Sequence, residues 1–327
     1  MSLQHASPWR RLAITALLAM LTIAGFSWSE AEARTAHHHA RAVRQAADKR
    51  VVHGPKYHPP YSAIVIDHNS DQVLHGENVD EPRHPASLTK IMTLYLLFEQ
   101  LEAGRLKLDT PLRVSAFAAQ QPPTKLGLRA NQTLAVEDAI KGLVTKSAND
   151  AAVVVAEAIA GSEAEFAKLM TQKARALGMM STTYINASGL PADEQITTAR
   201  DQALLGCTIQ DHFPDYYRYF STPSFHYHGV EMHNHNALLG QLEGVDGIKT
   251  GYTEASGYNL VTSVRRQEKH IVAVVLGGTS NAKRDARMRE LITRYMPLAV
   301  MGRTQIYVRK PRFEHEVQPA DASIGNM

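Results

Sequence analysis

The segment Pro85-Ala86-Ser87-Leu88-Thr89-Lys90 places a serine and a lysine three residues apart at the start of a predicted helix. The helix is expected over residues 87–101, because apolar residues recur there at helical spacing, at Leu88, Ile91, Leu94, Tyr95 and Phe98. Pro85 stands just before this segment and Gly104 just after it, which is typical of the two ends of a helix. Ser87 and Lys90 should therefore share one face of the helix.

This pair has the residue types that nucleophilic catalysis requires. A serine hydroxyl is a weak nucleophile until a base removes its proton, and Lys90 could act as that base only when neutral. Burial or a nearby second cation would lower its pKa, and the electropositive helix N-terminus would favour a serine that becomes negative. Alone, the S-x-x-K pattern is weak, because Ser280-Asn281-Ala282-Lys283 also matches it. Ser87 could simply cap the helix, and Lys90 could be a solvated surface residue.

Two further motifs follow in the chain, each of which occurs once. Ser147-Ala148-Asn149 precedes a predicted helix at residues 151–160, where Ser147 could also serve as a helix cap. Lys249-Thr250-Gly251 combines a cation with a hydroxyl, which suits a substrate carboxylate at a strand edge, and the glycine would let a ligand approach the backbone. The alternative without a function is that these three residues form an ordinary turn with an exposed lysine. The three motifs together are far more specific than any one of them, and Lys249 is the obvious second cation for Lys90.

The order of predicted elements indicates the fold class. Strands are expected at residues 62–67 and 72–75, then helices at 87–101, 136–144, 151–160 and 163–177, then strands at 258–264 and 270–276 and a last helix at 282–295. This order predicts an α+β domain, in which one sheet takes strands from both ends of the chain and a helical region is inserted between them.

The first 33 residues have the features of a secretory signal peptide. Arg10 and Arg11 precede an apolar run at residues 12–26, and Ala31-Glu32-Ala33 matches a cleavage site; an uncleaved anchor is the alternative. We expect a linker at residues 34–60, a catalytic domain at 61–300 and a tail at 301–327, with no amphipathic anchor helix at the C-terminal end. The protein should therefore be periplasmic or elsewhere in the cell envelope, without a membrane anchor of its own after cleavage.

Composition narrows the function further. The chain has 327 residues and a formal net charge of only +3, which gives no reason to expect nucleic acid as a partner. Its single cysteine, Cys207, cannot form an intrachain disulfide and should be a buried, inert thiol. Four histidines could alternate along two facing strands of a hairpin: His226, His228, His233 and His235. Such an arrangement could bind zinc. We expect instead a solvated hairpin without a metal.

The three motifs, in this order, resemble those of penicillin-binding proteins and serine β-lactamases. Longer strings resemble the low-molecular-mass D-alanyl-D-alanine carboxypeptidases over roughly residues 60–297. They are residues 85–90, Asn186-Ala187-Ser188-Gly189-Leu190, Thr198-Ala199-Arg200-Asp201 and Asp246-Gly247-Ile248-Lys249-Thr250-Gly251. The resemblance implies a β-lactamase or penicillin-binding transpeptidase-like fold, an antiparallel sheet flanked by helices with an inserted helical subdomain.

The resemblance also implies a role for each site residue. Ser87 would be the nucleophile, Lys90 its base, and Ser147 the relay of a proton to the leaving D-alanine. The implied substrate-binding residues are Asn149, Lys249, Thr250, Gly251, Tyr252 and Arg284, with the oxyanion bound by the backbone N–H groups of Ser87 and Tyr252. The implied substrate is a peptidoglycan stem peptide, β-lactams would be covalent inhibitors, and no cofactor is needed.

Several alternatives remain beside this interpretation. A class A β-lactamase would carry a Glu-x-x-x-Asn string between Ser147 and Lys249, and none is present. A D,D-endopeptidase of the same fold would cut cross-links instead of terminal D-alanine, and a non-catalytic wall-binding module would have decayed motifs. Family members with a second all-β domain and an anchoring helix are longer than this chain, and some have His where Ser188 stands. The sequence does not decide between carboxypeptidase and endopeptidase, nor the preferred peptide or the oligomeric state.

Overall fold

The computed structural model describes residues 59–302. The predicted signal peptide at 1–33, nearly all of the predicted linker at 34–60 and nearly all of the predicted tail at 301–327 lie outside the described residues, so these three remain predictions. Within residues 59–302, no helix combines the length and the apolar character needed to cross a membrane.

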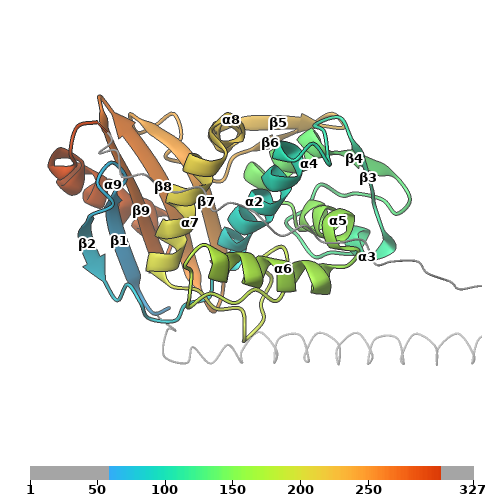
Figure 1. The fold of residues 1–327 in the computed structure, drawn as a ribbon, viewed down its shortest axis with the longest axis horizontal. Helices are drawn as coiled ribbons and strands as arrows, with labels where there is room; N and C mark the ends of the chain where they lie inside the picture. Colours follow the sequence, from blue (N-terminus) through green and yellow to red (C-terminus); the bar gives the residue numbers. More distant parts are fainter. Residues whose placement is uncertain (1–58, 303–327) are drawn as a thin grey trace, which may run out of the picture. The chain divides into compact units, whose positions relative to one another are not determined.

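A five-stranded antiparallel sheet takes its strands from both ends of the chain, as predicted (Figure 1). Its order is β2 (Val73–Glu77), β1 (Ser62–Asp67), β9 (Lys269–Gly278), β8 (Gly257–Arg266) and β7 (Val245–Thr253). The register sets Ala63 of β1 opposite Val275 of β9, and Val274 opposite Val261 of β8. The β-branched residues of these strands fit a sheet whose two faces are both covered.

The two faces of the sheet contribute to two separate cores. Because side chains alternate along a strand, Ala63, Val65 and Val275 pack against helix α9 (Asn281–Tyr295) and the short turn η3 (Met296–Leu298). Ile64 and Val274 belong to the larger core on the opposite face, where helix α7 (Ala199–His212) contacts β1, β8 and β9. The sheet is therefore the middle layer of this part of the molecule.

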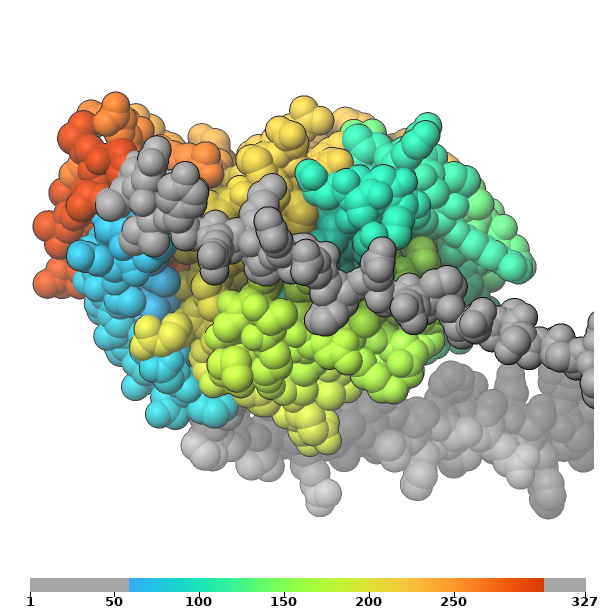
Figure 2. All heavy atoms as spheres, viewed as in Figure 1, coloured from blue at the N-terminus to red at the C-terminus, as the bar shows by residue number. Residues whose placement is uncertain are grey.

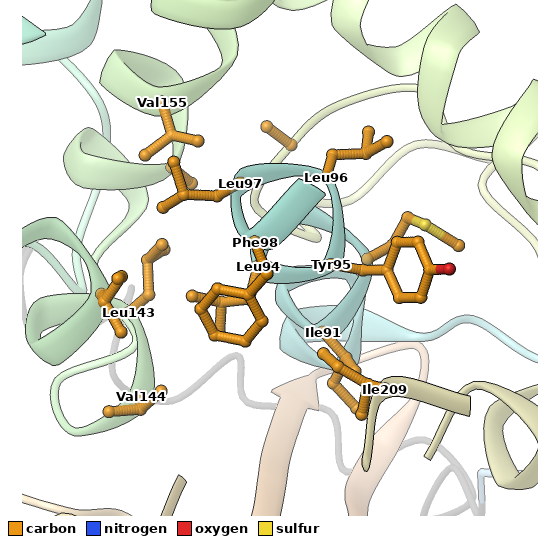
Figure 3. Close-up of a cluster of buried hydrophobic side chains, with 14 of the residues drawn as sticks. Ile91, Leu94, Tyr95, Leu96, Leu97, Phe98, Leu143, Val144, Val155 and Ile209 are labelled. Atoms are coloured by element: carbon orange, nitrogen blue, oxygen red, sulfur yellow. The ribbon is translucent and has the colours of Figure 1, made fainter. Parts of the chain in front are cut away.

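Helix α2 (Thr89–Glu102) lies at the centre of the helical region, in contact with α4 (Val136–Val144), α5 (Asn149–Ala160), α6 (Glu163–Ala176) and α7. Figure 3 shows its side chains pointing outward in several directions, with Leu97 toward Val155 and Ile91 toward Ile209. Nearly every residue of α2 is buried, so the helix is surrounded by protein and has no broad face exposed to solvent. Truncation of one large residue such as Phe98 to alanine should cost about 3–5 kcal/mol of stability.

The helical region and the sheet occupy different ends of the described part. In Figure 2 the blue and orange-red residues, from the two ends of the sequence, lie together at one end, and the teal and green residues of the helical region lie at the other. The remaining elements are short: η1 (Ala86–Leu88), β3 (Pro111–Arg113), α3 (Ala116–Ala119), β4 (Thr133–Ala135), α8 (Pro214–Tyr217), η2 (Arg218–Ser221), β5 (Ser224–Tyr227) and β6 (Val230–His233).

Most predicted elements are present within one or two residues of their expected ends, but α7 was not predicted. Several positions on its buried face hold polar residues, which form hydrogen bonds there, so the apolar residues do not recur at helical spacing. Gln202 donates to Thr197 Oγ1 at 2.9 Å, and Gln210 accepts from Ser263 Oγ at 3.1 Å. Cys207, on the same helix, is buried as expected.

Candidate active site

Ser87 lies in the turn that leads into α2. Residues 86–88 form the short 3-10 helix η1, so the predicted helix over 87–101 begins two residues later, at Thr89. Pro85 occupies the cap position of this turn, and Ala86 has a positive φ of 49°, which is uncommon for a residue other than glycine. The Ser87 side chain is half-buried and opens into a cavity.

Lys90 lies against Ser87 inside the protein. Its side chain is 0% exposed, and Nζ is 3.2 Å from Ser87 Oγ, 2.8 Å from Asn149 Oδ1 and 2.5 Å from the Ser188 carbonyl oxygen. Burial lowers the pKa of Lys90 well below its usual value, and the charge of Lys249 lowers it further, against a smaller opposite effect of Asp150 and Glu163. Burial and the nearby cation therefore both favour the neutral form of the Lys90 amine.

The hydrogen-bond partners also fit a neutral amine. The Asn149 oxygen and the Ser188 carbonyl can only accept, so they take the two N–H bonds of a neutral Lys90. Asn149 is oriented for this, because its Nδ2 donates to the Pro122 carbonyl at 2.9 Å. The lone pair of Lys90 Nζ then faces Ser87 Oγ, which can donate its proton.

Ser147 approaches the same cavity from the loop before α5. Its φ is 58°, in the left-handed region, and its buried Oγ has no hydrogen-bond partner among the described residues. Such strain and an unsatisfied hydroxyl are features that functional sites retain. The alternative that Ser147 caps the following helix is wrong: α5 begins at Asn149, and Ala148 holds the cap position without a side-chain hydrogen bond.

Strand β7 brings Lys249, Thr250 and Gly251 to the opposite wall. Lys249 is 1% exposed and donates to the Thr250 carbonyl at 3.0 Å, so the alternative of an exposed lysine in a turn is wrong. Burial lowers the pKa of Lys249 to about 7, with a contribution from Arg284. A Cβ at Gly251 would lie 3.1 Å from both the Pro85 oxygen and the Ser87 nitrogen, so a larger residue would press on the turn that carries Ser87.

Arg284 and Tyr252 complete the wall beside β7. Arg284, on α9, is buried, forms an ion pair with Asp285 at 2.8 Å and donates to the Asn259 carbonyl at 3.3 Å. Tyr252 is 54% exposed and its ring lies 4.3 Å from that of Tyr258. The second S-x-x-K match has an ordinary structural role, because Ser280 caps α9 by accepting from the Lys283 N–H at 3.1 Å.

These residues surround one cavity of about 540 Å³. Seven of the nine predicted site residues line it, while Lys90 and Lys249 lie buried in its wall. The seven are Ser87, Ser147, Asn149, Thr250, Gly251, Tyr252 and Arg284. A volume of this size accommodates a small ligand, and these seven residues come from four segments that are distant in sequence.

His235 also lines the cavity and was not predicted as a site residue. The predicted hairpin is present as β5 and β6, but His228 lies in its turn with a φ of 48° and His235 lies beyond it. Partial burial and the surrounding cations, Lys249 first, lower the pKa of His235 to about 4. Among residues 59–302, no group of three or more His, Cys, Asp or Glu side chains is placed to hold a metal ion.

The Ser188 carbonyl is a second contributor that sequence reasoning missed, because the contact uses a backbone atom and has no residue-type signature. The segment Asn186–Gly189 is held by Asn186, whose Oδ1 accepts the N–H groups of Ser188 and Gly189 at 3.2 and 2.7 Å. Gly189 has a φ of +86°, and a Cβ there would lie 1.8 Å from the Ala86 oxygen. The motif at 186–190 therefore braces the turn that carries Ser87.

Comparison with known proteins places this geometry in a family. Residues 50–280 match the family model of the S11 peptidases, described as D-alanyl-D-alanine carboxypeptidase. The D-alanyl-D-alanine carboxypeptidase DacA of Escherichia coli is 36% identical over 239 residues, which are 71% of this chain and 59% of that protein. The chain thus spans about three fifths of the length of this relative.

Solved structures agree. Penicillin-binding protein 5 of Haemophilus influenzae matches with a TM-score of 0.70 and 30% identity, over 74% of this chain and 72% of that one. Penicillin-binding protein D2 of Listeria monocytogenes, in its ampicillin-bound form, matches with a TM-score of 0.62 and 31% identity, over 71% and 95% of the two chains. The expected penicillin-binding fold is therefore confirmed.

Proposed function

The chain belongs to the D-alanyl-D-alanine carboxypeptidase family of peptidases, and we propose that it removes the terminal D-alanine of peptidoglycan stem peptides through an acyl-enzyme on Ser87. One observation carries this proposal: Ser87 Oγ lies 3.2 Å from the buried Lys90 Nζ, at the wall of a cavity that also contains Ser147, Thr250 and Arg284.

In the first step Ser87 attacks the carbonyl carbon of the last peptide bond. Neutral Lys90 accepts the Ser87 proton, a new bond forms between Oγ and the carbonyl carbon, and negative charge moves to the carbonyl oxygen. The backbone N–H groups of Ser87 and Tyr252 would stabilise that charge. Burial lowers the Lys90 pKa and so favours the deprotonated base that this step requires.

In the second step the C–N bond breaks, and the proton that Lys90 took from Ser87 passes to the leaving nitrogen of D-alanine, so that Lys90 is neutral again. Ser147 is suited to pass that proton on, because its hydroxyl is buried at the cavity and has no partner among the described residues. Asn149 would orient the substrate backbone and holds Lys90 at 2.8 Å. A water molecule then attacks the ester carbon and gives a proton to Lys90; the bond between that carbon and Ser87 Oγ breaks, and the proton returns from Lys90 to Oγ.

The wall formed by Lys249, Thr250 and Arg284 supports exo-acting recognition. A free C-terminal carboxylate needs cationic or hydroxyl partners when it leaves water, and Arg can offer two parallel donors. These three residues supply such groups on the side of the cavity formed by β7 and α9. An endopeptidase has less need of them, because its leaving group continues into another peptide.

Penicillin should react as the substrate does. A β-lactam that mimics the acyl-D-Ala-D-Ala unit would acylate Ser87, as the ampicillin-bound form of the related penicillin-binding protein D2 leads us to expect. The N-terminal charge, apolar run and cleavage pattern in residues 1–33 support export to the periplasm or another part of the cell envelope, where peptidoglycan is found.

Two measurements test the proposal. Labelled penicillin should attach to a peptide that contains Ser87, and Ser87→Ala should abolish the adduct; equal labelling of that variant would exclude Ser87. Mass spectrometry of products should then show release of D-alanine from a muramyl pentapeptide. Cleavage of a cross-linked dimer in preference to the pentapeptide would instead establish the endopeptidase alternative.

A further inference from the structure

Glu163 lies outside the cavity and has no role in the reaction described above. It is the first residue of α6, and its half-buried side chain points at the segment Asn186–Gly189. Its Oε1 accepts the backbone N–H of Ala187 at 3.0 Å. Helix α6 lies beside α2, the helix that carries Lys90 (Figure 1).

The Ala187 peptide is held from two sides. While Glu163 accepts its N–H, Thr93 Oγ1 donates to its carbonyl at 2.6 Å. Thr93 stands one turn after Lys90 on α2, and both Ala187 and the next residue, Ser188, are 0% exposed. A buried N–H without a partner is costly. Loss of the Glu163 carboxylate would therefore leave the Ala187 N–H without its acceptor and the peptide held only by Thr93.

These two hydrogen bonds to the Ala187 peptide also affect the position of Lys90, the proposed base. The carbonyl of Ser188, one residue after Ala187, accepts from Lys90 Nζ at 2.5 Å. We infer that Glu163 is a positioning residue of the proposed acylation, which fixes the Ser188 carbonyl against Lys90 through the Ala187 amide. The inference rests on the proposed role of Lys90 as the base that activates Ser87.

Among the described residues, the charges of Lys249, Asp150 and Glu163 act on Lys90, and the Lys90 charge in turn acts on His235 at the cavity. Lys249 on β7 favours its neutral form, and Asp150 on α5 and Glu163 on α6 favour its charged form. Asp150 is committed to the loop before α4, because its carboxylate accepts the N–H groups of Leu126, Gly127 and Leu128. Glu163 is therefore the acid whose charge can be removed while its hydrogen bond is kept.

The test uses Glu163→Gln and Glu163→Ala, because glutamine still accepts the Ala187 N–H and alanine does not. The Lys90 pKa is measured directly by NMR titration of 13C-labelled lysine, with the signal assigned by its loss in Lys90→Arg. Glu163→Gln should lower this pKa, because it removes a negative charge that favours the ammonium form of Lys90.

The second readout is the acylation rate by labelled penicillin across pH. In Glu163→Gln the acidic limb should move to lower pH with a near-normal maximum, while Glu163→Ala should lower the maximum itself by about 10-fold or more. The matched control is Glu165→Gln, an exposed acid in the same first turn of α6 that pairs with Lys168 at 2.6 Å. It should change neither quantity.

The outcomes separate the two proposals. If Glu163→Gln leaves the Lys90 pKa and the acidic limb where Glu165→Gln leaves them, and Glu163→Ala acylates at the normal rate, the role of Glu163 is wrong. If the wild type forms no penicillin adduct, the proposed function fails, and the NMR titration still decides whether Glu163 acts on Lys90.

Discussion

Replacement of Lys249 by methionine should make the protein more stable while it removes activity. The buried environment lowers the Lys249 pKa from 10.5 to about 7, a difference of about 3.5. At about 1.4 kcal/mol for each pKa unit, the site disfavours the ammonium form by about 5 kcal/mol. Methionine has a similar volume and no charge, so the packing around position 249 should be retained.

The net gain should be smaller than this upper bound. Relaxation around a buried charge reduces its cost, and replacement of buried charges by apolar residues typically stabilises by roughly 1–4 kcal/mol. A gain of about 2 kcal/mol would raise the Tm at pH 7 by about 4–8 °C for a domain of this size. Penicillin acylation should fall at the same time, because the substrate-side cation is gone.

The gain should depend on pH in a defined direction. Between pH 7 and 10.5 the unfolded Lys249 holds a proton that the folded form has lost, so wild-type stability rises with pH in this window. The advantage of Lys249→Met should therefore be largest below pH 7 and shrink toward pH 10. Calorimetry of both proteins at pH 6, 7 and 9 measures this.

A surface lysine provides the control. Lys168 is exposed and forms its ion pair at the surface of α6, so Lys168→Met should change the Tm little at any pH. A Lys249→Met variant that is less stable than the wild type at pH 6, or whose advantage does not change with pH, would show that Lys249 is not a strained buried cation.

Three further predictions concern the reaction. Lys90→Arg should abolish acylation by labelled penicillin, because arginine stays protonated; normal labelling would exclude Lys90 as the base. Gly251→Ala should lower kcat/KM for pentapeptide by about 10²-fold, since its Cβ would press on the backbone at Ser87 and displace β7; an unchanged rate would mean that the strand can shift freely. As Lys249 loses its proton above pH 7, kcat/KM for a free-acid peptide should decline there relative to that for its C-terminal amide, and parallel profiles would contradict a carboxylate site at Lys249.

The arrangement of the site was largely predictable from three short motifs. Each motif alone had an ordinary alternative, but Ser87, Ser147 and Thr250 do line one cavity, where β7, a strand that was not predicted, contacts η1. Helical spacing predicted α4, α6 and α9 well, because these helices expose a polar face to solvent.

Other features depend on contacts that residue types do not reveal. The Ser188 carbonyl and the Ala187 amide act through backbone atoms, and α7 buries polar side chains that conceal its apolar period. His235 reaches the cavity because Asn236 donates to the Gly247 carbonyl at 3.2 Å, which ties the chain beyond the hairpin to β7. Only the folded backbone makes these contacts visible.

The pairing of β1 with β9 determines when the sheet can form during synthesis of the chain. Residues 62–67 find their partners at 271–276, about 200 residues later, so the sheet cannot close until almost the whole described part of the chain has been synthesised. At roughly 5–20 residues per second, the apolar strand Ala63-Ile64-Val65-Ile66 waits roughly 10–40 s without β9, with an edge open to other chains. Lys249 and Thr250 are also synthesised late, so a nascent chain lacks part of the proposed active site, and we expect no reaction with substrate or antibiotic before synthesis is nearly finished.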